Sequence, residues 1–192
     1  MKQLKMYWRR QPVEEFSLPE GFSVTQYRFP EDKERFADIW LDGKPEQDPD
    51  VFDKSITNYP DAVAERDVFF IVRGEEYVAT ITAIYHPAEN KGYIHMVAAK
   101  TKVRGLGIGN FMNSLALKRL CEYPCEYVYL TTDDFRKPAI KSYLRAGFLP
   151  VDYDEDMPAR WQALIEEFGI PQVEMLHDDT SYSRTLVAGK PV

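Results

Sequence analysis

The stretch from Ile94 to Leu120, IHMVAAKTKVRGLGIGNFMNSLALKRL, decides the fold of this chain. It begins with a short apolar run that predicts a strand over 93–99. A basic link leads into a segment with three glycines. After it, apolar residues recur at spacings of three and four, which predicts a helix over 107–122: Ile108, Phe111, Met112, Leu115, Ala116 and Leu120. The order is therefore strand, glycine turn, helix.

This order predicts an anion-binding site. The backbone N–H groups in the first turn of a helix have no partner inside the helix, and the helix dipole adds partial positive charge there. Glycines let a phosphate approach the backbone, because no Cβ stands in the way. The expected ligand is a phosphate or a pyrophosphate.

The spacing of the glycines narrows the choice of ligand. Gly105, Gly107 and Gly109 form G-x-G-x-G, whereas the dinucleotide fingerprint needs a glycine at position 110, which is Asn110. The Gly-Lys-Ser/Thr of a P-loop is absent as well. The remaining pattern, R-x-x-G-x-G from Arg104, resembles the acetyl-coenzyme A loop of the GNAT N-acetyltransferase superfamily, which holds the pyrophosphate of coenzyme A. The alternative is a glycine-containing helix start without a ligand.

A second motif follows at the interval that this superfamily uses. The run Leu130–Asp134, LTTDD, leads to Ala139–Phe148, AIKSYLRAGF, which resembles the signature A-I-x-x-Y-x-x-x-G-F. Pro138 suits the first turn of a helix there, and Gly147 suits its end. Two motifs in the right order indicate the family more strongly than either alone. The resemblance covers about residues 22–151.

The resemblance implies an α/β (α+β) fold, with a mixed, mostly antiparallel central sheet that is flanked by helices and splayed between its fourth and fifth strands. We expect one domain over 1–192, with an N-terminal arm at 1–21, a core at 22–151 and a C-terminal extension at 152–192. Expected strands are 22–29, 68–72, 77–85, 93–99, 127–132 and 148–151. Further helices are expected at 31–41 and 51–59, around Tyr143, and from a cap at Asp156 to Gly169. A last strand is expected at 173–176 or 185–187.

The resemblance also implies how coenzyme A is bound. Its pantetheine arm should pair with the backbone of Val97, Ala98 and Ala99, where one N–H could polarise the thioester carbonyl. The pyrophosphate should meet the backbone amides of Arg104, Gly105, Leu106, Gly107, Ile108, Gly109 and Asn110. Two positions depart from the pattern. Arg136 stands where many members have an Asn that contacts pantetheine, and Thr131 stands where some members have a Glu base.

Two side chains are the candidate catalytic groups. Tyr143 matches the tyrosine of the signature and should lie beside the cofactor, where it could donate a proton to the departing thiolate, since a thiol has a pKa of ~8.5 and a tyrosine ~10. His95 is the candidate base, because an imidazole accepts a proton near neutral pH, and we expect it to share a strand face with Val97 and Ala99. For both residues the alternative is a packing role, and for the base a water chain or a carboxylate remains open. Tyr93 should share the face of His95.

Other polar groups have two interpretations each. Lys100, Lys102 and Arg104 either offset phosphate charge or form a solvated basic turn. The acidic segment 42–53 either connects two elements or attracts an amine to the site. His86 and His177 are expected at the surface.

Composition limits the remaining choices. In 192 residues, 44% are hydrophobic and 14% aromatic, which is typical of a globular protein. A formal net charge of −7 disfavours nucleic acid and suits a cationic amine. The two cysteines, Cys121 and Cys125, are too few for a disulfide framework, and no metal-ligand cluster accompanies them. No apolar run is long enough for a membrane span or a signal peptide, so the cytoplasm is the expected compartment. A homodimer is compatible with the sequence.

These observations predict an acetyl-CoA-dependent N-acetyltransferase. The acetyl group would pass directly to the amine in a ternary complex, because no cysteine at the motif positions offers a covalent relay. The favoured acceptor is a small primary amine or an amino acid derivative, and the alternative is a protein or peptide amine, either lysine or an N-terminus. A different class is a non-catalytic acyl-CoA-binding or sensing module, which would not need the Tyr143 hydroxyl.

Overall fold

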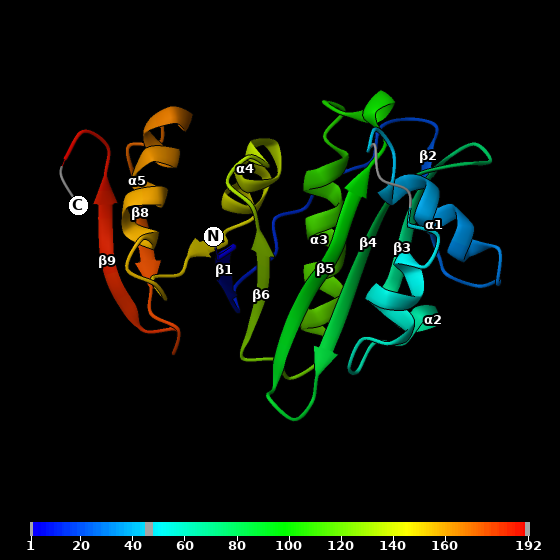
Figure 1. Ribbon diagram of the computed structural model, residues 1–192, viewed down its shortest axis with the longest axis horizontal. Coiled ribbons are helices and arrows are strands. Elements are labelled where there is room, and N and C mark those ends of the chain that lie inside the picture. The colour runs from blue at the N-terminus through cyan, green and yellow to red at the C-terminus, as the bar shows by residue number, and fades with distance from the viewer. Residues whose placement is uncertain (1, 45–47, 191–192) are drawn as a thin grey trace.

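The structure of the protein is a computed structural model, which describes residues 2–44 and 48–190. A seven-stranded sheet in the order β2-β3-β4-β5-β6-β1-β7 runs through this part of the chain, with helices packed on it (Figure 1). Its strands are β1 (Leu4–Arg9), β2 (Phe22–Gln26), β3 (Val68–Arg73), β4 (Glu76–His86), β5 (Lys91–Ala99), β6 (Tyr127–Thr132) and β7 (Leu149–Pro150). The helices are α1 (Asp32–Trp40), α2 (Ala64–Asp67), α3 (Ile108–Cys121), α4 (Lys137–Arg145) and α5 (Met157–Phe168).

The sheet opens between its two parallel strands. β5 and β6 are parallel, and every other pair of neighbouring strands in this sheet is antiparallel. β5 and β6 pair only from Lys91 opposite Tyr127 to Tyr93 opposite Tyr129, although β5 continues to Ala99 and β6 to Thr132. Beyond Tyr93 the two strands therefore diverge. This arrangement confirms the predicted mostly antiparallel sheet that is splayed between the strand at 93–99 and the strand at 127–132.

The two faces of the sheet carry different hydrophobic clusters. One face packs against α3, α4 and α5, and its largest buried side chains include Trp8 and Trp161. The other face packs against α1 and the segment 51–57, through Phe36, Phe52 and Phe70. The apolar stripe of α1 explains its place, because Phe36 and Ile39 on one helix face are 0% and 1% exposed. The part of β5 that diverges from β6 lies between these two layers.

The N-terminal segment is not an arm, which corrects the expectation for residues 1–21. Residues 4–9 form β1, which pairs with β6 along six residues and with β7 along two. Leu4, Met6 and Trp8 alternate along it and are at most 2% exposed, so this strand is part of the core. The alternation was present in the sequence, with Lys5 as a polar residue between Leu4 and Met6, and the predicted arm overlooked it. Lys5 reaches the surface and pairs with Asp178 at 2.6 Å.

The C-terminal region contains more structure than expected. Both candidate strands form, as β8 (Gln172–Leu176) and β9 (Tyr182–Val187), and they pair in a two-stranded sheet. A parallel bridge from Val151 to Leu176 joins this hairpin to the end of β7. The helix expected up to Gly169 is α5, and Gly169 ends it with a φ of 68°. Asp156 is its N-cap residue but makes no side-chain cap hydrogen bond.

The segment before α2 is short and irregular. A π-helical turn covers Asp53–Thr57 in the region where a helix over 51–59 was predicted. In the acidic segment 42–53, Asp48 pairs with Lys54 and Asp53 with Lys33, so these carboxylates are locally neutralised. Pro45 and Glu46 of that segment lie outside the described residues. In the described ranges, none of the helices has the length and apolarity that crossing a bilayer requires.

Candidate active site

The glycine loop presents a row of backbone amides. Gly107 is the N-cap residue of α3, and Gly105 and Gly107 have φ values of 80° and 79°. Arg104 N–H donates to the Thr101 carbonyl at 3.2 Å, and Asn110 N–H donates to the Gly107 carbonyl at 3.1 Å. Between them, and within the described chain, the amides of residues 105–109 have no hydrogen-bond acceptor. Of the amides predicted to meet the pyrophosphate, those of Arg104 and Asn110 thus have acceptors inside the protein.

The loop has the room and the charge that a pyrophosphate requires. A Cβ built on Gly105 or Gly107 would meet no atom within 4 Å, so the space in front of both glycines is open. α3 has 14 residues, so it has a full dipole, and its first turn carries no acidic side chain. The five open amides, the positive end of the helix and the missing side chains fit a diphosphate group.

The basic residues before the loop differ in their surroundings. Lys100 pairs with Asp38 at 2.5 Å and with Glu76 at 3.5 Å, and Lys102 also pairs with Glu76. Their charges are therefore compensated inside the protein. Arg104, in contrast, has no ion-pair partner among the residues that the structure describes. Of the three cations predicted to offset phosphate charge, Arg104 is the one without an ion pair in the described ranges, and Asp42 lies within electrostatic range of it.

A hydrogen-bonded chain fixes α4 to the start of α3. Ser142 Oγ donates to Asn110 Oδ1 at 2.9 Å, and Asn113 Nδ2 donates to Ser142 Oγ at 2.8 Å. A Cβ on Gly109 would lie 3.5 Å from Ser142 Oγ, so the two helices are in close contact there. Because Ser142 precedes Tyr143, these contacts set the position of Tyr143 relative to the glycine loop.

A bulge interrupts β5 in the middle of the predicted pantetheine segment. The register with β4 shifts between the pairs Thr82–His95 and Thr80–Ala98, and Met96 has a φ of 52°. An extra residue on one strand leaves backbone groups outside the ladder and increases the local twist. A positive φ at a residue other than glycine stores strain, which is concentrated at functional sites in proteins. The bulge thus exposes backbone at the point where β5 leaves β6.

The bulge also corrects the predicted orientation of His95. Met96 and Ala98 pack on the α1 face of the sheet, whereas Val97 and Ala99 pack on the α3 face. The His95 ring stacks on Tyr59, 4.7 Å between centroids, which follows the π-helical turn. His95 therefore does not share a face with Val97 and Ala99, because the extra residue breaks the two-residue alternation of the strand.

Tyr143 is buried under the open part of the sheet. Its side chain is 6% exposed, and its ring meets the edge of Phe148 at 6.0 Å between centroids. Burial raises the pKa of Tyr143 to about 12, the charge of Arg136 opposes that rise, and Tyr93 adds to it. The hydroxyl therefore stays protonated at neutral pH and lies within electrostatic range of residues on both sides of the opening.

His95 forms a hydrogen-bonded pair with Tyr93. Its Nδ1 lies 2.9 Å from the Tyr93 hydroxyl. Burial lowers the pKa of His95 to about 4, although the backbone oxygen of Ser55 partly opposes this shift. Nε2 is buried, and none of the described residues gives it a hydrogen bond of good geometry. At neutral pH the imidazole is uncharged, so one ring nitrogen can accept a proton or a hydrogen bond.

An aromatic cluster closes the paired end of the opening. Tyr93 stacks on Tyr129 with 4.4 Å between centroids and a 7° interplanar angle, at the last paired position of β5 and β6. Burial raises the pKa of Tyr93 to about 12, and burial also raises the pKa of Tyr129. The Tyr59 and Thr131 hydroxyls lie close enough to the Tyr93 hydroxyl to influence its pKa. Thr131 thus faces the opening, although it cannot serve as a base.

His86 belongs to the same cluster, so the prediction that it lies at the surface is wrong. It is 6% exposed, its Nδ1 lies 2.8 Å from Asp61 Oδ2, and its ring is 6.3 Å from that of Tyr93. His86 contacts Tyr59 and Asp61, which precede it by more than twenty positions. No local sequence pattern therefore predicts its burial. His177 is exposed, as predicted.

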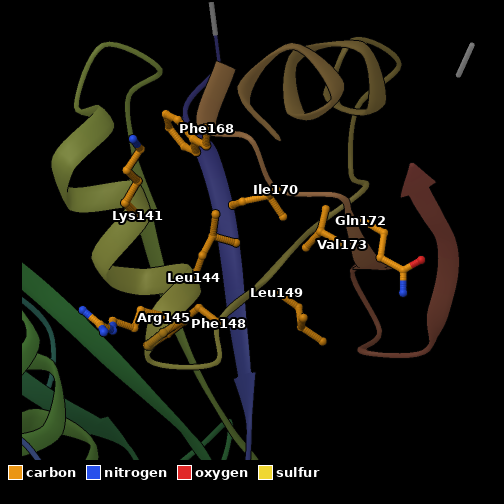
Figure 2. Close-up of a pocket in the computed structure, with 9 residues that line it drawn as sticks. All are labelled: Lys141, Leu144, Arg145, Phe148, Leu149, Phe168, Ile170, Gln172 and Val173. Carbon is orange, nitrogen blue, oxygen red and sulfur yellow. The ribbon is translucent and has the colours of Figure 1, made fainter. Parts of the chain in front are cut away.

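The structure thus brings Tyr93, His95, Thr131 and Tyr143 to one opening, next to the glycine loop. Sequence reasoning missed Tyr59, Asp61 and Tyr129. A cleft of about 470 Å³ lies elsewhere, between α4 and the segment around β8 (Figure 2). It is lined by Lys141, Leu144, Arg145, Phe148, Leu149, Phe168, Ile170, Gln172 and Val173. It contains none of the predicted catalytic residues. In the described ranges, no three metal-ligating side chains gather at one place.

A sheet that splays between two parallel strands, beside a helix start with open amides, is the arrangement of acyl-coenzyme A-dependent acetyltransferases. The chain belongs to the Acetyltransferase (GNAT) family, whose model matches residues 33–148, more than half of its length. The resemblance predicted from the two motifs is confirmed by this match.

Two curated relatives are similar over part of the chain. N-alpha-acetyltransferase 30 of Xenopus laevis is 33% identical over 84 residues, which are 42% of this chain and 31% of the relative. Mycothiol acetyltransferase of Streptomyces scabiei is 30% identical over 92 residues, 48% of this chain and 29% of the relative. The chain spans about a third of the length of these proteins. Their names give different acceptors, so they leave the acceptor class open.

Solved structures support the fold. A GCN5-related N-acetyltransferase from Sphaerobacter thermophilus has a TM-score of 0.62 at 20% identity, covering 77% of this chain and 48% of that chain. Arabidopsis thaliana Naa50, in complex with the bisubstrate analogue CoA-Ac-MVNAL, has a TM-score of 0.54 at 17% identity. This second match covers 66% of this chain and 82% of Naa50.

Proposed function

We propose that the protein is an acetyl-CoA-dependent N-acetyltransferase that moves an acetyl group to a primary amine by direct attack. The observation that carries this proposal is the row of backbone amides at 105–109, which have no acceptor within the described chain, at the start of α3. A hydrogen bond from Ser142 to Asn110 joins α3 to α4, the helix that carries Tyr143. Both parts of the family pattern therefore meet at one opening of the sheet.

The residues divide into binding and reacting groups. The amides of 105–109 would hold the diphosphate, with Arg104 adding a positive charge. The backbone of Val97, Ala98 and Ala99, beside the bulge, would pair with the pantetheine arm. One N–H at Val97 or Ala98 would donate to the oxygen of the tetrahedral intermediate. When bound, acetyl-CoA supplies an acetyl thioester activated for acyl transfer.

Tyr143 would act on the leaving group as a hydrogen-bond donor. Its pKa of about 12 exceeds that of a thiol, ~8.5, so complete proton transfer to the thiolate would cost about 5 kcal/mol. A shared hydrogen bond from a buried hydroxyl avoids this cost and still stabilises the developing charge. The final proton would reach sulfur from solvent.

His95 would orient the acceptor rather than act as a strong base. With a pKa of about 4, its imidazole holds a proton poorly at neutral pH. It can still accept a hydrogen bond from a neutral amine or from a water that removes the proton. The pair formed by His95 and Tyr93 would then fix the direction from which the amine approaches.

The favoured acceptor remains a small primary amine. Rings of Tyr59, Tyr93 and His95 pack against one another on the α1 side of the opening, which limits its width there. A peptide N-terminus is the second candidate, and the similarity to an N-alpha-acetyltransferase favours it.

Two measurements test the proposal. Coenzyme A and acetyl-CoA should each raise the melting temperature, because both bind the folded state. A thiol-release assay with a panel of amines, amino acids and peptides should then identify the acceptor. A protein that neither ligand stabilises would contradict the proposal. A protein that both ligands stabilise, but that releases no thiol with any acceptor, would support the binding or sensing module instead.

A further inference from the structure

Arg136 lies at the mouth of the opening between β5 and β6. It is the N-cap residue of α4, and its Nε lies 3.0 Å from Asp133 Oδ2. Its guanidinium also lies over the ring of Trp40, 6.0 Å from the centroid. Trp40 ends α1, on the other side of the opening. Arg136 is therefore held at the mouth by a carboxylate on one side and an aromatic ring on the other. Its ion pair with Asp133 is partly exposed to solvent, so the carboxylate cancels only part of its positive charge.

The geometry of α4 directs Tyr143 toward this charge. Seven residues separate Arg136 from Tyr143, which places them about 20° apart around the helix axis. Side chains on a helix tilt toward its N-terminus, so the Tyr143 hydroxyl points back toward the Arg136 end of α4. The opposing influence of Arg136 on the pKa of Tyr143 agrees with this arrangement.

A cation is needed at this place. Tyr143 is too weak an acid to protonate a thiolate fully, and its burial disfavours any negative charge beside it. Asp133 is paired with Arg136, and Lys44 lies over the same Trp40 ring as Arg136, so it adds positive charge nearby. Arg136 is the cation whose charge acts on Tyr143.

We propose that Arg136 stabilises the thiolate of coenzyme A as it leaves, from beside the Tyr143 hydroxyl. In that step the N–C bond forms, the C–S bond breaks and its electron pair stays on sulfur, while the proton of the amine leaves to water. The position that many family members fill with a neutral Asn would here supply charge. This inference rests on the proposed function.

The test measures how the affinity for coenzyme A depends on pH. A cation beside the sulfur lowers the pKa of the bound thiol, so the affinity for coenzyme A increases as pH rises through that range. Acetyl-CoA has the same phosphates but no thiol, so it corrects for every other titrating group. Calorimetric titrations of both ligands at pH 7 and pH 9 give the ratio of their affinities at each pH. A lowering of one pKa unit would increase that ratio about sixfold between the two pH values.

Three variants complete the experiment. In Arg136→Gln the increase should disappear, because the charge is lost while hydrogen bonding is kept. In Arg136→Lys most of it should return. Arg184 lies on β9, away from the opening, and its guanidinium pairs with Asp152. Arg184→Gln also removes a paired guanidinium and should behave as the wild type. With a reactive amine, kcat should fall about tenfold in Arg136→Gln and much less in Arg136→Lys.

The outcomes separate the two proposals. If the wild type binds neither ligand, the proposed function fails. If it binds both, but the affinity ratio changes with pH equally in the wild type and in Arg136→Gln, the proposed function stands and the role of Arg136 is excluded. If Arg136→Gln binds acetyl-CoA normally and loses only the pH dependence, misfolding is excluded as the cause and the role is supported.

Discussion

The two sides of the opening in the sheet are built by different means. On the coenzyme side, the start of α3 and the bulge of β5 offer mainly backbone groups, and few side chains intrude. On the acceptor side, Tyr59, Tyr93 and His95 fill the space with packed rings. A site built from backbone groups depends on glycines at fixed spacing, so a short sequence motif is enough to predict it. A side-chain site depends on residues from distant segments, so it can change acceptor while the coenzyme side stays the same.

The largest effect is expected at Tyr143, where the two sides meet. Tyr143→Phe removes only the hydroxyl, so turnover should fall about 10²- to 10³-fold, as is typical when one hydrogen-bond donor to a developing negative charge is lost. Steady-state kinetics would measure kcat, and calorimetry the affinity for acetyl-CoA, which should stay within about twofold.

Tyr182→Phe provides the matched control for this prediction. Tyr182 is exposed on β9, and its hydroxyl lies 3.1 Å from Thr185 Oγ1 on the same strand. It should keep full activity. A Tyr143→Phe enzyme with wild-type kcat would exclude the hydroxyl from the reaction and leave the coenzyme side as a binding site alone.

The acceptor side should also affect stability as a function of pH. The pKa of His95 is lowered to about 4 in the folded protein, from about 6.5 when unfolded. The unfolded chain therefore binds more protons, and stability contributed by neutral His95 is lost as pH falls from above 6.5 toward 4. Between pH 7 and pH 5 this loss amounts to about 2 kcal/mol. Urea unfolding at both pH values would measure it.

In His95→Gln this part of the pH dependence should disappear. His177→Gln, at an exposed position, should retain it and serves as the control. Equal pH dependence in the wild type and in His95→Gln would mean that His95 is protonated normally in the folded state, and its place in the acceptor site would have to be revised.

The coenzyme side responds to the bulk of a single methyl group. Gly107→Ala would place a Cβ in the open space in front of the amides, at a φ of 79°. We expect the affinity for coenzyme A to fall about tenfold or more, since the methyl group occupies the position of the diphosphate. Gly74→Ala imposes similar backbone strain in the β3–β4 turn, where φ is 61°.

Binding by calorimetry, together with melting temperatures, separates strain from occlusion. Both variants should lose a similar stability, about 1 kcal/mol, but only Gly107→Ala should bind coenzyme A more weakly. If both variants bind equally well, the cradle lies elsewhere.

The smallest effect is expected at Lys102. Its ammonium pairs with Glu76 and is exposed, so Lys102→Ala should change the affinity for coenzyme A by less than about twofold. Arg104→Ala, two residues further on, should have the larger effect, because Arg104 is held in no ion pair among the described residues. An equal loss in both variants, measured at low salt, would show that the ion pair of Lys102 opens for the ligand.

Much of the core was accessible to sequence reasoning. The apolar and β-branched runs of β3 to β6, the helical spacing of α3 and α5, and the glycine loop are local patterns, and each was recovered within a few residues. The bulge at Met96 was not, because a positive φ at a residue other than glycine depends on the neighbouring strand. The burial of His86 depends on Asp61, and that contact is tertiary. The hydroxyl of Tyr143 could be named from its motif, whereas the lowered pKa of His95 required its surroundings.

The place of β1 has a consequence for synthesis on the ribosome. Residues 4–9 are translated before the other strands of this sheet, and their neighbours β6 and β7 follow more than a hundred residues later. Until β6 is made, Leu4, Met6 and Trp8 have no strand to cover them, so this apolar segment stays exposed while the intervening residues are translated. Chaperone engagement at this segment, and delayed assembly of the half of the sheet that bears Tyr129 and Thr131, follow from the order of the strands.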